Sequence, residues 1–159
     1  MLDAIDRKLL AALQECNRAS LESLAETVGS SRSAVGRRLR RLRLDRVIRR
    51  EIAIVDQRRV GPLETFIIHT EVHRGNGSMA SAFLAGVREL PEVQQCYLTT
   101  GTINCVLIVV VRDSSAIETF VDEHLVDNPF IRTFTTSLVT RSVKVGLGVP
   151  TGLLDGVEV

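Results

Sequence analysis

The chain has 159 residues, enough for one domain of ordinary size or two small ones. With 45% hydrophobic and 25% charged residues, it has the composition of a globular protein and not of a disordered chain. The longest uninterrupted apolar run, residues 105–111, is too short to cross a membrane, and the acidic N-terminus lacks the layout of a signal peptide. We therefore expect a cytoplasmic protein without a membrane partner.

Charge is distributed unevenly along the chain, although the net charge is only +1. Residues 1–60 hold 14 basic and 8 acidic side chains, a charge of +6, whereas residues 61–159 hold 6 and 11, a charge of −5. A basic segment joined to an acidic one predicts that the first part of the chain meets a polyanion. Chance clustering of solvated charges is the alternative that charge alone leaves open.

Apolar residues at three- and four-residue spacing predict three helices in the basic segment. The predicted inward positions are Ile5, Leu9, Leu13 and Cys16, then Leu21, Leu24, Ala25 and Val28, then Val35, Leu39 and Leu42. Asp3 or Asp6, Ser20 and Ser31 are the predicted N-caps, and Gly29 is expected to end the second helix. Two helices joined by a short turn that contains glycine form a helix-turn-helix.

The third predicted helix carries the groups that DNA recognition needs. Arg32 and Arg37 are candidates for base readout, because arginine can bond a guanine edge in two places. The other arginines are candidates for phosphate contacts, which position a protein without reading sequence. The predicted DNA-binding residues are Ser31, Arg32, Ser33, Arg37, Arg38, Arg40, Arg41, Arg46 and Arg49. Gly36 lies on the predicted outer face, either to let the helix approach the groove or as a tolerated defect; a solvated helix without nucleic acid is the alternative to the whole interpretation.

The remainder of the chain is expected to form a small α+β sandwich, preceded by a short strand at Arg49–Asp56. The expected strands are Glu64–His73, Val93–Thr100, Cys105–Arg112 and Ile131–Val143, and the expected helices run from Ser78 to Leu90 and from residues 113–115 to Asp127. The inward positions of the helices are Met79, Ala82, Phe83 and Val87 or Leu90, then Ile117, Phe120, Val121 and Leu125. This order of strands and helices is the split βαβ, or ferredoxin-like, arrangement. Since residues 106–111 are apolar throughout, both faces of the sheet need cover, and a second copy of the chain is the obvious cover for one of them.

Short motifs along the chain form an ordered series. They are residues 2–14 (LDAIDRKLLAALQ), 24–29 (LAETVG), 31–35 (SRSAV), 38–42 (RLRRL), 47–48 (VI), 128–129 (NP) and 143–144 (VK). In order and spacing they resemble the leucine-responsive/asparagine regulator (Lrp/AsnC, or feast/famine) family over nearly the whole chain. The resemblance implies homodimers that build larger rings, commonly octamers, and an amino-acid effector in a cleft between subunits.

Together these observations predict an α+β protein in four parts. Residues 1–50 are a winged helix-turn-helix DNA-binding domain, and residues 51–63 a strand-bearing linker. Residues 64–144 are a ferredoxin-like βαββαβ regulatory domain of the RAM type, and residues 145–159 a C-terminal tail.

Three positions depart from the pattern of the family. Arg46 stands where members have a glycine that suits a tight turn. The family's Gly-x-x-Asp is here Gly101-Thr102-Ile103-Asn104, so a neutral amide replaces the carboxylate expected to pair with an amino acid's ammonium group. Phe134 replaces one of two threonines in the last strand, and Thr136 keeps the other. The resemblance places the effector site at Gly101, Thr102, Asn104 and Thr136, and it leaves open an amino-acid response or a different or absent effector.

We predict a sequence-specific transcriptional regulator that binds double-stranded DNA as a homo-oligomer without a cofactor. An amino acid or a related small molecule bound at a subunit interface is expected to modulate it. An architectural DNA-binding protein with little sequence preference is the alternative. An enzyme is disfavoured, because no Cys-His or Ser-His arrangement, carboxylate pair or metal-ligand spacing is evident. Cys16, Cys96 and Cys105 show no Cys-x-x-Cys spacing and are interpreted as buried thiols of a reducing compartment.

Overall fold

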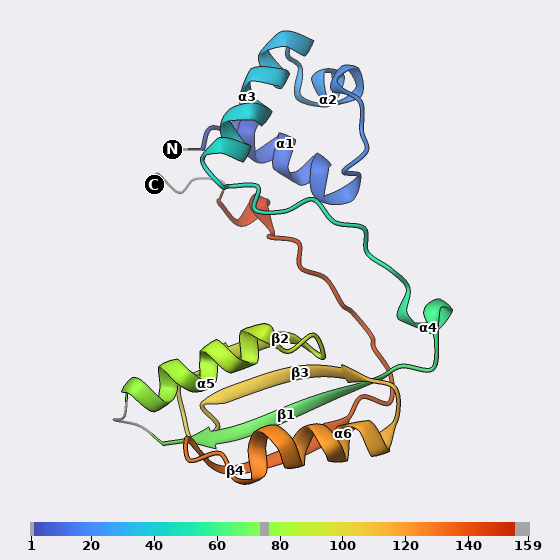
Figure 1. The fold of residues 1–159 in the computed structure, drawn as a ribbon. Helices are drawn as coiled ribbons and strands as arrows, with labels where there is room; N and C mark the ends of the chain where they lie inside the picture. The colour runs from blue at the N-terminus through green and yellow to red at the C-terminus, as the bar shows by residue number, and fades with distance from the viewer. Residues whose placement is uncertain (1, 74–76, 155–159) are drawn as a thin grey trace. The chain divides into compact units, whose positions relative to one another are not determined.

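The computed structural model describes residues 2–73 and 77–154, and the chain divides into two compact units (Figure 1). The first unit comprises the N-terminal segment as far as Ile54 together with the C-terminal tail from Lys144. The second unit comprises Val55–Val143. None of the helices in the described residues is long and apolar enough to cross a bilayer.

Three helices form the first unit. They are α1 (Ala4–Glu15), α2 (Leu21–Val28) and α3 (Arg32–Leu44). Each begins at a predicted cap, since the side chains of Asp3, Ser20 and Ser31 accept a hydrogen bond from the backbone N–H three residues later. Asp3 and Asp6 make reciprocal bonds, which is a capping box, and Gly29 ends α2 in the left-handed region with φ of 64°. The predicted starts of all three helices are therefore confirmed.

The core of this unit is apolar and lies between the three helices. Its buried members are Leu9, Leu24, Ala25, Val28, Val35, Leu39 and Leu42. The prediction that Cys16 belongs to this core is wrong, because α1 ends at Glu15 and Cys16 is extended and exposed. The thiols are thus not all buried: Cys96 is half-buried, and only Cys105 is buried.

The predicted strand at Arg49–Asp56 is absent. None of the described strands pairs with this segment, and its apolar Ile52 and Ile54 are 62% and 89% exposed. A strand needs a hydrogen-bonding neighbour, which a single chain does not supply here. The linker is instead an extended segment without strand pairing, followed by the short helix α4 (Gln57–Val60), whose cap is Asp56.

The second unit has the predicted ferredoxin-like order. Its elements are β1 (Glu64–Val72), α5 (Gly77–Glu89), β2 (Val93–Leu98), β3 (Cys105–Val111), α6 (Ser114–Val121), a π-helical turn (Asp122–Val126) and β4 (Ile131–Leu138). The strands lie in the order β2-β3-β1-β4, and every neighbouring pair is antiparallel. The sequence places Ser78 at the start of α5 as a cap, but the helix already includes Gly77.

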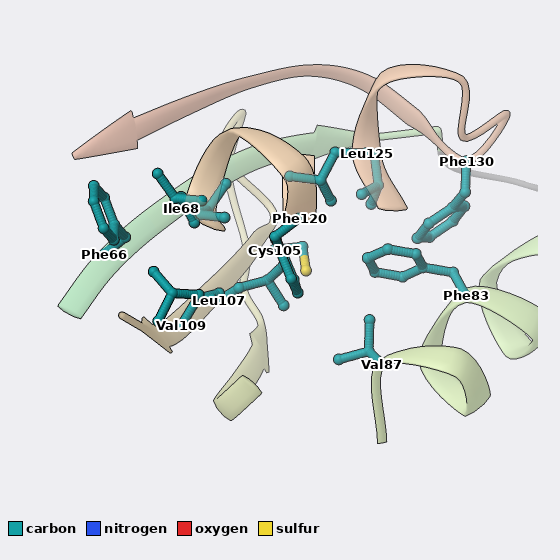
Figure 2. Close-up of a cluster of buried hydrophobic side chains, with 13 residues drawn as sticks. Phe66, Ile68, Phe83, Val87, Cys105, Leu107, Val109, Phe120, Leu125 and Phe130 are labelled. Carbon is teal, nitrogen blue, oxygen red and sulfur yellow. The ribbon is translucent and has the colours of Figure 1, made fainter. Parts of the chain in front are cut away.

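Both α5 and α6 pack on the same face of the sheet. Buried residues alternate along β1 and β3, so that one face of each strand points into the core. Figure 2 shows these side chains converging with Phe83 and Val87 of α5 and Phe120 of α6. Ala82 is exposed, which corrects its predicted place in the core.

Within the described residues of the second unit, no helix covers the opposite face of the sheet. It carries Ile67 and His69 of β1 and Val106, Ile108 and Val110 of β3, all half-buried in the single chain. An apolar sheet face of this kind is typical of a surface that a partner covers.

The last strand is shorter than the sequence predicts, because it ends at Leu138 and not at Val143. Leu138 pairs with Phe66, and Val139 bonds Thr65, next to the first residue of β1. The described residues beyond this point, up to 154, have no partner strand. The chain then continues as the tail, which ends the described residues with the 3₁₀ turn η2 (Thr151–Leu154).

The tail is attached to α1 of its own chain. The side-chain amide of Gln14 donates to the carbonyl of Val149 at 3.0 Å and accepts from its N–H at 2.6 Å. η2 also contacts α1. The predicted C-terminal tail therefore includes an anchored turn that belongs to the helical unit.

Candidate DNA-binding surface and effector cavity

The outer face of α3 is basic and accessible. Arg37 and Arg40 are exposed, and within the described residues neither side chain has an ion-pair partner. Ser33 is exposed on the same helix, whose opposite face is buried in the core. The two guanidinium groups are free, and the opposite face of the helix packs on the core. This arrangement suits contacts with a polyanion.

The N-terminus of α3 carries the other residues predicted to meet bases. The hydroxyl of Ser31 accepts from the backbone N–H of Ala34 at 3.3 Å and lies 3.2 Å from the hydroxyl of Ser33. Arg32 pairs with Glu22 of α2 at 3.0 Å, with more than half of each side chain exposed. An exposed ion pair contributes only about 0–1 kcal/mol, so Arg32 can exchange this carboxylate for a nucleic-acid group.

Arg38 and Arg41, by contrast, hold α3 against the start of α1. Nη1 of Arg38 donates to Asp3 at 2.5 Å and to Asp6 at 2.9 Å, and Nη2 of Arg41 donates to the other oxygen of Asp6. The side chain of Asp6 is only 1% exposed. The backbone N–H of Asp6 and the guanidinium of Arg38 lower the pKa of Asp3 below its ordinary value of 3.8. These two arginines therefore have a structural partner before any DNA is present.

The sequence contains a signal for this arrangement that charge counting misses. Asp6 lies one residue after Ile5 and three before Leu9, at the edge of the apolar face of α1. A carboxylate at such a position becomes buried, and a buried carboxylate needs a cation. Arg38 and Arg41, three residues apart on one flank of α3, are that cation pair.

Arg46 lies in the turn after α3 and has a positive φ of 55°. Among the described residues, no other non-glycine residue has a positive φ. Only glycine adopts this region without strain, which explains the glycine expected here. Arg46 and Arg49 are both exposed, as phosphate contacts require. Gly36 does not lie on the outer face as predicted: a Cβ at this position would lie 3.9 Å from Leu21 of α2.

A cavity of about 560 Å³ lies where one end of β1, the β2–β3 hairpin and the start of β4 meet. Its lining residues are Glu71, Val72, His73, Gly101, Thr102, Asn104 and Arg132. Three of the four residues predicted for the effector thus line one cavity. Thr136 does not: it lies on β4 opposite Ile68, on the face of the sheet that carries the helices.

Asn104 is buried and ties the hairpin to β1. Its Oδ1 accepts from the N–H of Val72 at 2.7 Å, and its Nδ2 donates to the carbonyl of the same residue at 3.1 Å. Its backbone N–H donates to Thr70 at 3.1 Å. An amide satisfies both groups of Val72, whereas a carboxylate would satisfy only the N–H. Asparagine at this position therefore has a structural reason.

Comparison with known proteins follows the same division of the chain. A sequence model of the AsnC-type helix-turn-helix domain matches residues 2–43, and a model of the Lrp/AsnC ligand binding domain matches residues 65–149. The chain belongs to the Lrp/AsnC family. The resemblance found in the sequence motifs and the predicted fold class are thereby confirmed. The family and the relatives below are transcriptional regulators and not enzymes.

Relatives of this Lrp/AsnC regulator match it over most of their length. An uncharacterised HTH-type transcriptional regulator of Sinorhizobium fredii, y4tD, is 36% identical over 149 residues, which are 94% of this chain and 88% of the relative. The transcriptional regulator AzlB of Bacillus subtilis is 31% identical over 150 residues, 94% and 96% of the two chains. The solved complex of the Neisseria meningitidis regulator NMB0573 with L-methionine superposes with a TM-score of 0.87 at 28% identity, covering 97% and 99%.

Sequence reasoning about this Lrp/AsnC regulator missed four residues of the cavity, Val72 and three titratable ones. Glu71, His73 and Arg132 come from the ends of two strands that are far apart in the chain, and only the sheet pairing brings them together. Glu71 and Arg132 form an ion pair at 2.9 Å. Opposite charges at the ends of neighbouring strands would have been a usable signal, but only once the register of β1 and β4 was known.

Proposed function

We propose that this Lrp/AsnC regulator binds DNA sequence-specifically, with α3 in the major groove. The observation that carries the proposal is the division of arginines on α3: Arg38 and Arg41 anchor the helix, and Arg37 and Arg40 are left free on its outer face. Arg37, nearer the N-terminus, is assigned to base readout together with Arg32. Exposed basic residues at and beyond the end of the helix are assigned to phosphates.

We further propose that the open face of the sheet is covered by a second copy of the chain. The face is apolar along β3, and an isologous pairing lets one surface cover itself. A two-fold dimer would set two α3 helices in successive major grooves, roughly 34 Å apart along the duplex. Larger rings such as octamers, which the family resemblance implies, would then bend or wrap the DNA.

The cavity is our candidate for an effector site, with Gly101, Thr102 and Asn104 as its predicted residues. Its position in a domain matched by the Lrp/AsnC ligand binding model, and the L-methionine complex of the structural neighbour, support an amino acid or a related small molecule. Thr136 joins this site only if the assembly brings it there. An effector changes DNA binding only through unequal affinity for two states of the assembly.

The decisive experiment compares binding to the DNA upstream of the chain's own gene with binding to scrambled DNA, at near-physiological salt, with and without amino acids. Preference for the upstream DNA is expected. Arg37→Ala should reduce that preference, at a cost of about 1–3 kcal/mol on the preferred DNA. Arg40→Ala should weaken binding to both DNAs equally. It should also reduce the magnitude of the slope of log K against log salt by about 1.

Arg112→Ala is the control matched in charge, because Arg112 is exposed but lies in the sheet unit, directly after β3. It should leave DNA binding unchanged. Equal binding of the wild type to both DNAs would favour the architectural alternative. Equal effects of the α3 variants and the control would refute the assignment to α3.

Dimerisation is tested separately by sedimentation. Ile108→Glu introduces a charge in the middle of the open face and should shift the protein towards the monomer. Thr119→Glu, on the exposed side of α6, is the control. An unchanged sedimentation coefficient for Ile108→Glu would refute the proposed interface.

A further inference from the structure

The candidate effector cavity contains an ion pair between two residues that lie outside the sequence motifs. Nη1 of Arg132 donates to Oε1 of Glu71 at 2.9 Å, across the end of the β1–β4 pair. Both residues line the cavity. The side chain of Arg132 is 66% exposed and that of Glu71 is 26% exposed, so solvent reaches both charges.

Among the described residues that line the cavity, Glu71 is the sole carboxylate. Asn104, which replaces the acidic residue of the family pattern, is neutral, and its amide already bonds both backbone groups of Val72. An ammonium group in the cavity would therefore find its anionic partner on β1 and not on the hairpin. The replacement at 104 removes a charge from one wall, and Glu71 supplies one on another.

Arg132 supplies the complementary group. A guanidinium has five N–H donors in a planar fork that matches a carboxylate, and the bond to Glu71 uses Nη1. Within the described residues this is the one bond of the Arg132 side chain, which leaves donors for a second carboxylate. Glu71 and Arg132 thus present an anion and a cation side by side, with zero net charge.

We propose that Glu71 and Arg132 form a clamp for a zwitterion, in which Glu71 receives the α-ammonium group and Arg132 the α-carboxylate of a free amino acid. The inference rests on the proposed effector function and names the residues that select the ligand class. When a zwitterion binds, the ion pair between Glu71 and Arg132 is replaced by two ion pairs, one between each side chain and the ligand. A simple anion would face Glu71 and a simple cation would face Arg132, so either meets a repelling charge beside its partner.

The test measures ligand binding on the full chain in the absence of DNA. The common L-amino acids are screened at millimolar concentration by the rise in melting temperature, and the tightest is titrated by calorimetry. The corresponding decarboxylated amine and the corresponding des-amino acid are titrated beside it. The variants are Glu71→Gln and Arg132→Gln, which keep the shape of the cavity wall and remove one charge each. Glu64→Gln, at the opposite end of β1, is the control.

Each variant should affect one end of the ligand. Glu71→Gln should weaken binding of the amino acid and the amine by about tenfold or more, the usual cost of losing one charged hydrogen bond. Binding of the des-amino acid should not weaken and should tighten, because this anion loses its repelling neighbour. Arg132→Gln should weaken binding of the amino acid and the des-amino acid by a similar factor. Binding of the amine should not weaken and should tighten, because this cation loses its repelling neighbour. Both variants should keep the wild-type melting temperature without ligand, because the pair is exposed to solvent.

Three results would overturn the clamp: no amino acid stabilises the wild type, both variants bind the amino acid as the wild type does, or the two analogues bind as tightly as the amino acid. Because the test contains no DNA, its result does not depend on whether the protein binds DNA sequence-specifically. If the wild type showed no DNA preference but the variants affected the three ligands as expected, only the proposal of sequence-specific DNA binding would be refuted. Specific DNA binding without any amino-acid binding would sink the clamp alone.

Discussion

The helical unit and the sheet unit distribute their structural and functional residues differently. On α3, the core residues, the anchoring arginines and the free arginines alternate within a single helix of 13 residues. In the sheet unit, the core occupies alternating positions in the middle of β1 and β3, and the cavity lies at the strand ends and the hairpin. A substitution on α3 can therefore change stability and DNA binding together, whereas the solvent-exposed pair Glu71 and Arg132 of the cavity can be altered with little cost to the core.

The largest expected effect tests the overlap of roles on α3. Replacing both Arg38 and Arg41 by alanine leaves the carboxylate of Asp6 buried without a cation, and removing the partner of a buried charge costs about 3–5 kcal/mol. Chemical denaturation followed by helical circular dichroism should show this loss in the free energy of unfolding.

Adding Asp6→Ala to that double variant removes the buried charge and should restore most of the stability. The triple variant then reports the DNA contribution of the two arginines without the folding defect. If the triple variant is as unstable as the double one, the ion pairs are not what holds α3 in place.

The second effect concerns Asn104 in the sheet unit. Asn104→Asp replaces the donor to the carbonyl of Val72 by an acceptor, which should cost about 1–3 kcal/mol at neutral pH. Burial next to a carbonyl raises the pKa of the new carboxyl in the folded state, so the folded state binds the proton more tightly. The deficit should therefore be full above that raised pKa and shrink as the pH falls through it towards the ordinary pKa of the unfolded chain. A deficit that grows on acidification would contradict this account of Asn104.

A smaller gain is expected from Gly36→Ala. The new methyl group would lie 3.9 Å from Leu21, an ordinary contact, and alanine is favoured over glycine inside a helix by about 1 kcal/mol. The melting temperature should rise with DNA affinity unchanged, because the methyl group faces α2. Higher stability with weaker DNA binding would show instead that the helix needs glycine to approach the groove.

The smallest effect is expected at Arg46. Glycine at this position removes a left-handed strain of about 1–2 kcal/mol but adds a chain-entropy cost of roughly 0.5–1 kcal/mol. Arg46→Gly should therefore stabilise the fold by about 0–1.5 kcal/mol, with a midpoint below the gain expected at Gly36. Arg46→Lys keeps both the charge and the strain and serves as the control for DNA affinity. Weaker DNA binding for Arg46→Gly alone would assign Arg46 to a phosphate.

Much of the architecture could be predicted from local patterns. Capping residues such as Ser20 and Ser31, the apolar positions of α2 and α3, and the order of strands and helices all follow from neighbours a few residues apart in the chain. Such features depend on backbone geometry and on period, which the sequence carries directly.

The tertiary structure decided the features that join distant segments. Asp6 meets Arg38 across 32 residues, and Glu71 meets Arg132 across 61. β4 ends at Leu138, which pairs with Phe66 near the start of β1, and the segment at Arg49–Asp56 lacks a strand partner among the described residues. An ion pair or a ladder bond is a property of two positions at once. The sequence by itself determined which residues were available for such pairs. Only the packing within each unit determined which of them met.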